Sequence, residues 1–135
     1  MLSNGKKVVP TYIEGLLLGD DCIDQVAVYG EGRNFLTALV VPHWENLRRA
    51  LAAAGTNLDQ KGPEDLACHP GVDTFLRKRI DAALSQVANW ERIRKFLVLP
   101  QPFSVAAEEL TVSLKLRREV IFSNHKAELE ALYRE

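Results

Sequence analysis

One lysine in this 135-residue chain stands in a setting suited to binding an anion. Lys115 lies in the segment Leu110 to Leu116, between a proline-containing stretch and the last helical pattern, with Thr111 and Ser113 as small polar neighbours. A loop lysine is a compact positive charge on a long flexible stem, which can reach a carboxylate or a phosphate. The residues permit this chemistry without requiring it, because basic runs such as residues 115–118 are usually solvated faces.

The other residue types that commonly carry chemistry are scattered. His43, His69 and His125 lie far apart and show no metal-ligand spacing, so surface or core histidines are the simpler interpretation. Cys22 and Cys68 belong to no Cys-x-x-Cys or Cys/His cluster. We therefore expect neither a metal site nor a disulfide framework, and a reducing, cytoplasmic setting is the default.

Several function classes find little support in composition and pattern. Gly30 and Gly32 look like part of a dinucleotide fingerprint, but they lie between two predicted strands, whereas that fingerprint joins a strand to a helix. The formal net charge of -1 offers no broad electrostatic case for nucleic acid. No apolar run approaches the ~20 residues of a transmembrane segment, and no apolar region follows Lys6 and Lys7 to make a signal peptide.

The hydrophobic pattern predicts one small α+β domain over residues 1–135. The apolar fraction of 47% is enough for a core without disulfides. Strands are predicted at 23–29, 35–41 and 95–99, and helical patterns begin at 10, 44 and 70 and run over 117–133. The short turn at 30–34 makes the first two strands an antiparallel hairpin, and the second strand, apolar on both faces, should be central. The expected fold is a small three-stranded, mainly antiparallel sheet with helices packed on it.

Three groups of segments, spread over nearly the whole chain, carry a resemblance. Residues 5–14 read Gly-x-x-Val-x-Pro-x-x-Ile-Glu; residues 23–33 lead into 36–42; and residues 91–96 are followed by 102–103 and 109–118. In this order they resemble the C-terminal domain of the AMP-forming, adenylate-forming enzymes. Residues 3–7 and 114–118 are similar to the long-chain fatty acyl-CoA synthetase branch.

The resemblance implies a ligase that acts in two steps. A fatty acid and ATP, with Mg, give an acyl-adenylate, and coenzyme A then gives the thioester, while the small domain presents a different face in each step. Lys115 matches the family's catalytic lysine of the first step, and Arg118 fits as a supporting charge. Gly5, with Lys6, matches the loop beside the coenzyme A channel of the second step.

The same resemblance sets what we expect to be missing. The hinge, the phosphate-binding loop, the ATP site and the acyl pocket have no counterpart here, so we expect a C-terminal lid domain that is inactive without its N-terminal domain. Its partners would be that domain, fatty acid, ATP and coenzyme A, in the cytoplasm, with peripheral membrane association left open. Two alternatives remain: an adenylate ligase that loads a carrier protein, and a non-catalytic interaction module of the same fold.

Overall fold

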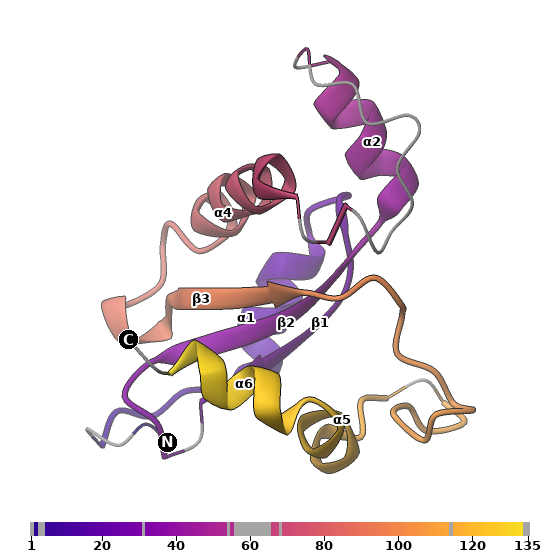
Figure 1. The fold of residues 1–135 in the computed structure, drawn as a ribbon. Coiled ribbons are helices and arrows are strands. Elements are labelled where there is room, and N and C mark those ends of the chain that lie inside the picture. Colours follow the sequence, from indigo (N-terminus) through magenta and orange to yellow (C-terminus); the bar gives the residue numbers. More distant parts are fainter. Residues whose placement is uncertain are drawn as a thin grey trace.

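The structure is a computed structural model that describes residues 2, 5–30, 32–53, 55, 66–67, 69–113 and 115–133. Its elements are, in order, α1 (Pro10–Leu18), β1 (Ile23–Tyr29), β2 (Leu36–Pro42), α2 (Trp44–Ala53), α4 (Pro70–Ala83), the 3₁₀ turn η1 (Asn89–Glu91), β3 (Ile93–Val98), α5 (Arg118–Asn124) and α6 (Lys126–Leu132). Figure 1 shows the strands side by side, with helices on both faces of the sheet. The α+β class predicted from the sequence is confirmed.

The sheet has the order β1-β2-β3, with the buried strand β2 in the middle. β1 and β2 form the predicted antiparallel hairpin, in which Val26 lies opposite Val40. β3 runs parallel to β2, with Leu97 opposite Leu39, so the sheet is mixed. A parallel neighbour requires a long crossover, which the chain supplies through α2 and α4.

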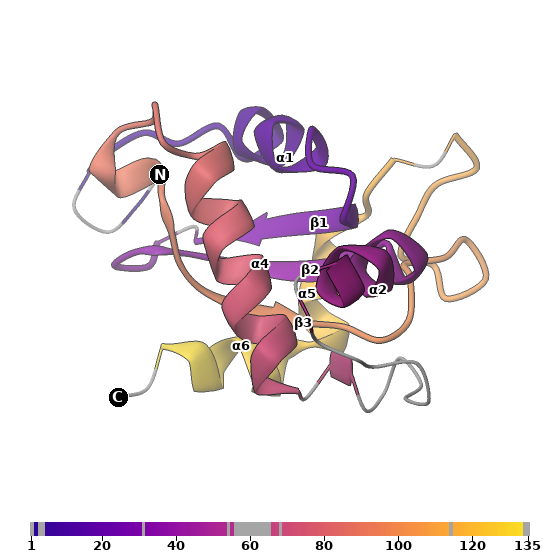
Figure 2. The ribbon, with the colours of Figure 1, turned by 90° about the horizontal axis from the view of Figure 1, so that it is seen from above.

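Alternation along the strands divides the core between the two faces of the sheet. Val26 and Val28 of β1 point into a cluster that α1, α2 and α4 cover. Ala27, between them, points into a second cluster, which Ile121 of α5 and Leu129 of α6 help to fill. Figure 2 shows α1 and α4 in front of the sheet and the C-terminal helices behind it. No helix in the described part of the chain is long and apolar enough to cross a bilayer.

The last helical pattern is divided, which the sequence did not predict. We expected one helix over 117–133, but α5 ends at Asn124 and α6 begins at Lys126. His125 between them has φ -114° and ψ 21°, outside the helical range. Its ring faces carboxylates on both sides, those of Glu128 and Glu109, so the side chain makes contacts at the point where the helix is interrupted.

A buried carboxylate joins three distant parts of the domain. Glu14 lies on the inner side of α1, and the backbone N–H of Val28 donates to its Oε2 at 2.8 Å. β1 is an edge strand, whose outward N–H groups have no strand partner, so Glu14 satisfies one of them. Both terminal nitrogens of Arg118, at the start of α5, donate to the same carboxylate. α1, β1 and α5 are therefore held at one point.

Replacing this carboxylate should destabilise the domain more than replacing an exposed one. The Glu14 and Arg118 side chains are 6% and 29% exposed, whereas Glu45 and Arg49 on α2 are 74% and 71% exposed. Glu14→Gln leaves a partly buried guanidinium without its counter-charge and should cost about 3 kcal/mol of unfolding free energy. Glu45→Gln should cost less than about 1 kcal/mol. Urea denaturation of both variants tests this, and equal losses would contradict it.

Candidate functional site

Lys115 lies in a short, internally bonded loop, which we call the lysine loop (described residues 110–113 and 115–116). Leu110 and Leu116 form an antiparallel bridge at its base. The Thr111 N–H donates to the carbonyl of Lys115 at 2.9 Å, and the Lys115 N–H donates to the Thr111 hydroxyl at 3.1 Å. Thr111 and Ser113, which the sequence marked only as small polar neighbours, also bond to each other through their hydroxyls. Polar side chains therefore shape the loop that carries the lysine.

The stretch that leads into the lysine loop is fastened to the sheet. The Leu99 N–H donates to the Val40 carbonyl at 2.8 Å, which extends the β2–β3 ladder by one bond. Farther along, the Phe103 N–H donates to the side-chain oxygen of Gln25 at 2.6 Å. Gln25 belongs to β1, so the connection crosses the end of the sheet and contacts its far edge strand. The loop therefore starts from a fixed place, although most of this stretch has no regular structure.

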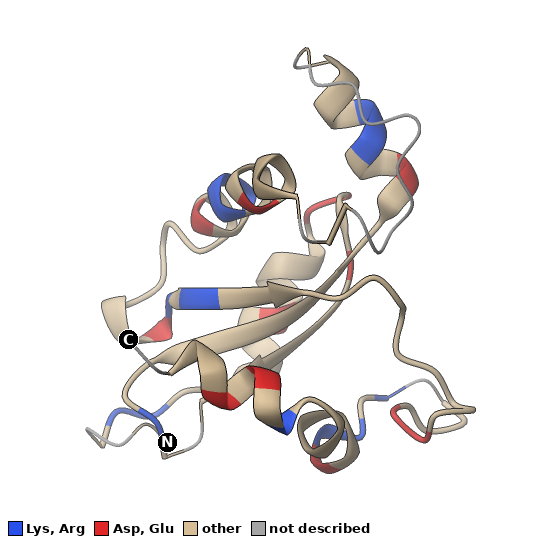
Figure 3. Ribbon diagram, in the orientation of Figure 1, with Lys and Arg blue, Asp and Glu red and all other residues tan. Residues whose placement is uncertain are grey.

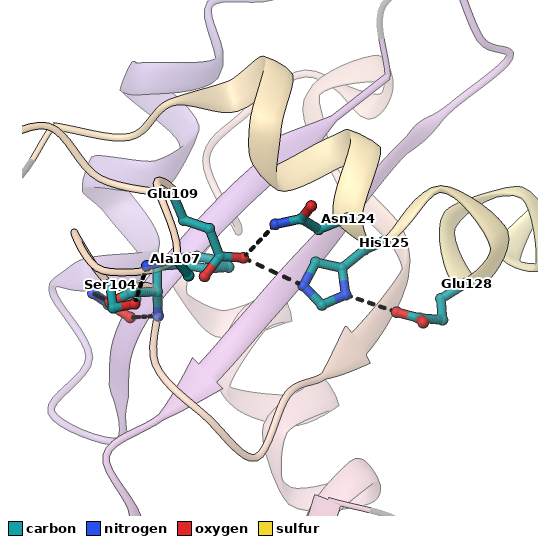
Figure 4. A network of polar contacts seen from close by, with 8 residues as sticks. Ser104, Ala107, Glu109, Asn124, His125 and Glu128 are labelled. Atoms are coloured by element: carbon teal, nitrogen blue, oxygen red, sulfur yellow. Dashed lines mark hydrogen bonds and ion pairs between the residues drawn. The ribbon is translucent and has the colours of Figure 1, made fainter.

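Glu109 connects the base of the loop to the residues that follow it. The Arg117 N–H donates to the Glu109 carbonyl at 2.8 Å. The buried Glu109 carboxylate accepts from the Asn124 amide at 3.4 Å, and its Oε2 lies 3.8 Å from Nε2 of His125. Figure 4 shows Glu109 and Glu128 on opposite sides of the His125 ring. The sequence named Glu109 only as part of a motif, and no periodicity or spacing marks these contacts.

Lys115 is exposed at the surface of the protein, as are Val112 and Ser113 in the same loop. Among the described residues, none offers a carboxylate partner to this lysine. A positive charge that is displayed in this way can bind an external anion without first breaking an internal ion pair.

Arg118 is placed differently, although it follows the loop directly. Its guanidinium is engaged by Glu14, and that hydrogen bond raises the pKa of the arginine further above its usual value. The charge is therefore balanced within the domain, and the geometry gives Arg118 a structural part at the start of α5. A direct part in catalysis stays a prediction.

Gly5 and Lys6 form a separate feature in the N-terminal segment. The Gly5 N–H donates to the Leu2 carbonyl at 3.0 Å, and Gly5 has a φ of 83°. The Lys6 ammonium lies 4.8 Å from the centre of the Trp90 ring, a cation–π contact. Figures 1 and 2 place this turn and the lysine loop at opposite ends of the sheet, and Figure 3 shows Lys and Arg at both ends.

The structure therefore separates Lys115 from Gly5 and Lys6, whereas the Arg118 side chain lies between them and lines a pocket with Leu2 and Val8 of the N-terminal segment. Ser3, Asn4 and Leu114, which belong to the motifs that carried the resemblance, lie outside the described residues. Among the residues that are described, no group of three His, Cys, Asp or Glu is placed to hold a metal ion.

Comparison with known proteins shows which family and which enzymes the chain is similar to. The family profile described as "AMP-binding enzyme C-terminal domain" matches residues 1–135. The chain is 31% identical to the long-chain-fatty-acid–CoA ligase FadD15 of Mycobacterium tuberculosis, over 97% of this chain and 22% of that protein. It is 30% identical to long-chain-fatty-acid–CoA ligase 5 of Rattus norvegicus, over 98% of this chain and 19% of that protein.

A solved structure shows the same likeness in three dimensions. The A-PCP didomain of a carboxylic acid reductase from Segniliparus rugosus, in complex with AMP, matches with a TM-score of 0.77 and 26% identity. The match covers 98% of this chain and 17% of that one. The chain thus spans about a fifth of the length of the proteins that it matches.

The N-terminal turn allows a sharp test of its backbone. A Cβ on Gly5 or on Gly15 of α1 would meet no atom within 4 Å, so the two positions differ in backbone conformation rather than in space. Gly5→Ala should destabilise the domain by about 1 kcal/mol, because its φ is positive. Gly15→Ala should stabilise it by about 0.5–1 kcal/mol, because alanine favours the helix. Denaturant titrations should give opposite signs, and equal signs would contradict the left-handed turn.

Proposed function

This chain belongs to the AMP-binding enzyme C-terminal domain family, and on that premise we propose that it serves as the C-terminal domain of an AMP-forming long-chain fatty acid–CoA ligase. The observation that carries the proposal is Lys115, exposed and without a carboxylate partner among the described residues, in a loop whose flanking residues are bonded to the sheet and to the start of α5. The similarity to long-chain-fatty-acid–CoA ligases supports the choice of substrate.

In the first step of the proposed reaction, a fatty acid carboxylate oxygen attacks the α-phosphorus of ATP. The bond to pyrophosphate breaks, and an acyl-adenylate forms. Two anions must approach each other, and negative charge is redistributed around the α-phosphate, so a cation already in place lowers the barrier. Lys115 supplies that cation. The internal bonds of its loop fix the backbone from which the side chain starts, so the loop itself needs little reorganisation when the substrates meet.

In the second step, the thiol of coenzyme A attacks the acyl carbonyl, and AMP leaves with the electron pair of the broken bond. We assign the Gly5–Lys6 turn to this step. Because that turn lies at the other end of the sheet from the lysine loop, one rigid domain presents both by rotating between the steps. Gly5 leaves open space where the thiol arm passes. Arg118 supports the domain itself, because its bond to Glu14 holds α5 against α1.

In this proposal the N-terminal domain of the same enzyme binds most of ATP and its magnesium. The partners of the C-terminal domain are that N-terminal domain, the fatty acid, ATP and coenzyme A. We place the enzyme in the cytoplasm as a further part of the proposal. The buried, unpaired thiol of Cys22 is compatible with a reducing compartment.

A second candidate is a ligase that passes the acyl group to a carrier protein instead of coenzyme A. The similarity to the A-PCP didomain of a carboxylic acid reductase favours it. The two candidates share the first step and differ in the acceptor. Incubation of the full-length enzyme with fatty acid, ATP and free coenzyme A separates them, because only the coenzyme A ligase releases acyl-CoA.

Removing the lysine should impair the first step selectively. In the full-length enzyme, Lys115→Ala should slow fatty acid-dependent exchange of pyrophosphate into ATP by on the order of 10²–10³, the effect of losing one preorganised charge contact. Thioester formation from pre-made acyl-adenylate and coenzyme A should change far less. Lys78→Ala, at an exposed lysine of α4, is the matched control and should leave both rates unchanged. Equal losses in both steps would make Lys115 structural.

A bulky side chain at Gly5 should give the opposite pattern. Gly5→Leu places a branched side chain where the thiol arm is proposed to pass, so thioester formation should fall while pyrophosphate exchange survives. The matched control is Gly55→Leu, because Gly55 also has positive φ and open space but lies after α2. If both variants lower the thioester rate equally, backbone strain alone explains the loss, and Gly5 does not line the channel.

A further inference from the structure

We propose that Glu109 is a positioning residue for Lys115, acting through His125 and Asn124 at the junction of α5 and α6. This inference rests on the proposed function of Lys115. Its structural part is that one buried carboxylate connects the base of the lysine loop to the C-terminal helices. Its functional part is that this connection keeps the lysine where the reacting anions meet, and so governs the adenylation step more than the thioester step.

The burial of Glu109 is the first observation that needs a cause. The residue is 8% exposed, although Glu108 beside it is exposed and could have taken its place at the surface. Burying a carboxylate is costly unless it is hydrogen-bonded or paired. Here the Asn124 amide donates to Oε2 at 3.4 Å, and Nε2 of His125 lies 3.8 Å from the same oxygen, close enough for an ion pair when the imidazole is protonated. Both partners belong to the helix junction, so the carboxylate ties the loop to that junction.

The ring of His125 is itself held in place. Its Nδ1 lies 2.7 Å from Oε2 of Glu128, one turn farther along in α6. Glu128 is half exposed, so the chain of contacts runs from the surface, through the imidazole, to the buried Glu109 (Figure 4). The Glu128 contact orients the ring and leaves Nε2 facing Glu109 across 3.8 Å, beyond hydrogen-bond distance, so Nε2 attracts that carboxylate when the imidazole carries both protons.

The backbone of Glu109 transmits this anchoring to the loop. Its N–H donates to the Ser104 carbonyl at 3.0 Å, and its carbonyl accepts the N–H of Arg117 at 2.8 Å. Residue 109 therefore bonds to the chain on both sides of the lysine loop, directly below the Leu110–Leu116 bridge. The preceding Glu108 has a φ of 62°, an uncommon conformation for a non-glycine residue that persists where the surroundings determine it.

A catalytic lysine on such a loop is sensitive to small displacements. A shift of about 1 Å in a reacting group can cost on the order of 10²-fold in rate. The long stem of Lys115 gives its ammonium many accessible positions, and the base of the loop decides where the stem begins. Glu109 contacts no reacting atom in this scheme. It acts through Lys115, and the two residues should therefore not contribute independently.

The first experiment uses the 135-residue chain and measures amide hydrogen exchange by NMR. Glu109→Gln should speed exchange at the Thr111 and Arg117 amides, whose bonds define the loop, and leave the buried Ile80 amide of α4 unchanged. The matched control is Glu108→Gln, at the exposed carboxylate next in sequence, which should change none of these amides. His125→Gln tests the same link from the helix side and should loosen the same two amides. Unchanged exchange in both Glu109→Gln and His125→Gln would overturn the inference.

The second experiment measures both half-reactions in the full-length enzyme. Glu109→Gln should lower fatty acid-dependent pyrophosphate exchange roughly 10- to 100-fold, while thioester formation from pre-made acyl-adenylate stays near the parent rate. Glu108→Gln should match the parent in both. In a Lys115→Ala background, Glu109→Gln should add little further loss, because residues that act as a unit are not additive.

The outcomes separate this inference from the function on which it rests. If the parent enzyme shows no fatty acid-dependent exchange, the proposed function fails, and the loss of a functional role for Glu109 follows from that. If Lys115→Ala is impaired but Glu109→Gln is not, the proposed function stands and the positioning role is refuted. If Glu109→Gln lowers both half-reactions equally, or adds its full effect to Lys115→Ala, Glu109 only stabilises the fold.

Discussion

The carboxylate of Glu14 is the contact on which the arrangement of the domain depends. It lies under α1, satisfies an N–H of the edge strand β1, and holds the guanidinium of Arg118, which is 104 residues away in the chain. Such a pair is costly to bury, and removing one partner is costlier still, because the other charge remains. The start of α5 is thereby fixed against the first helix. Since the lysine loop ends directly at α5, the place of Lys115 follows from this pairing as well.

The sheet separates the two features to which the proposed function assigns its two steps. β2 is buried throughout and forms a rigid centre, while the Gly5–Lys6 turn and the lysine loop lie beyond opposite ends of the strands. A rigid body with one chemical feature at each end can exchange them by rotation without refolding. This arrangement fits an enzyme with two successive steps, each of which needs a different group at the same reacting centre.

Polar contacts, rather than regular structure, shape the region around Lys115. The stretch from Leu99 to Arg117 contains no helix or named strand among its described residues, yet Gln25, Thr111 and Glu109 bond it at successive points. Ordering the backbone of such a stretch costs about 1–2 kcal/mol per residue, which these bonds offset at several points along it. The bonds also leave Val112 and Lys115 exposed, where they can meet a partner.

The sequence by itself determined the elements whose signals are local. Alternating apolar residues identified β1 within its observed bounds, the apolar run at 35–41 identified the central strand to within one residue, and Pro10 and Pro70 marked the first residues of α1 and α4. Motif order pointed to the family, which the match over the whole chain then showed. These features depend on side-chain period and backbone preference, which a short window contains.

Only the tertiary structure decided how the elements meet. It made β3 parallel to β2, because the crossover through α2 and α4 returns the chain to the end of the sheet where β2 begins. It divided the last helix at His125, gave Arg118 its partner Glu14, and buried Glu109 rather than Glu108. None of these outcomes has a period or a spacing in the sequence. They depend on which polar groups the packed fold brings within hydrogen-bond distance, and burial makes each such group require a partner.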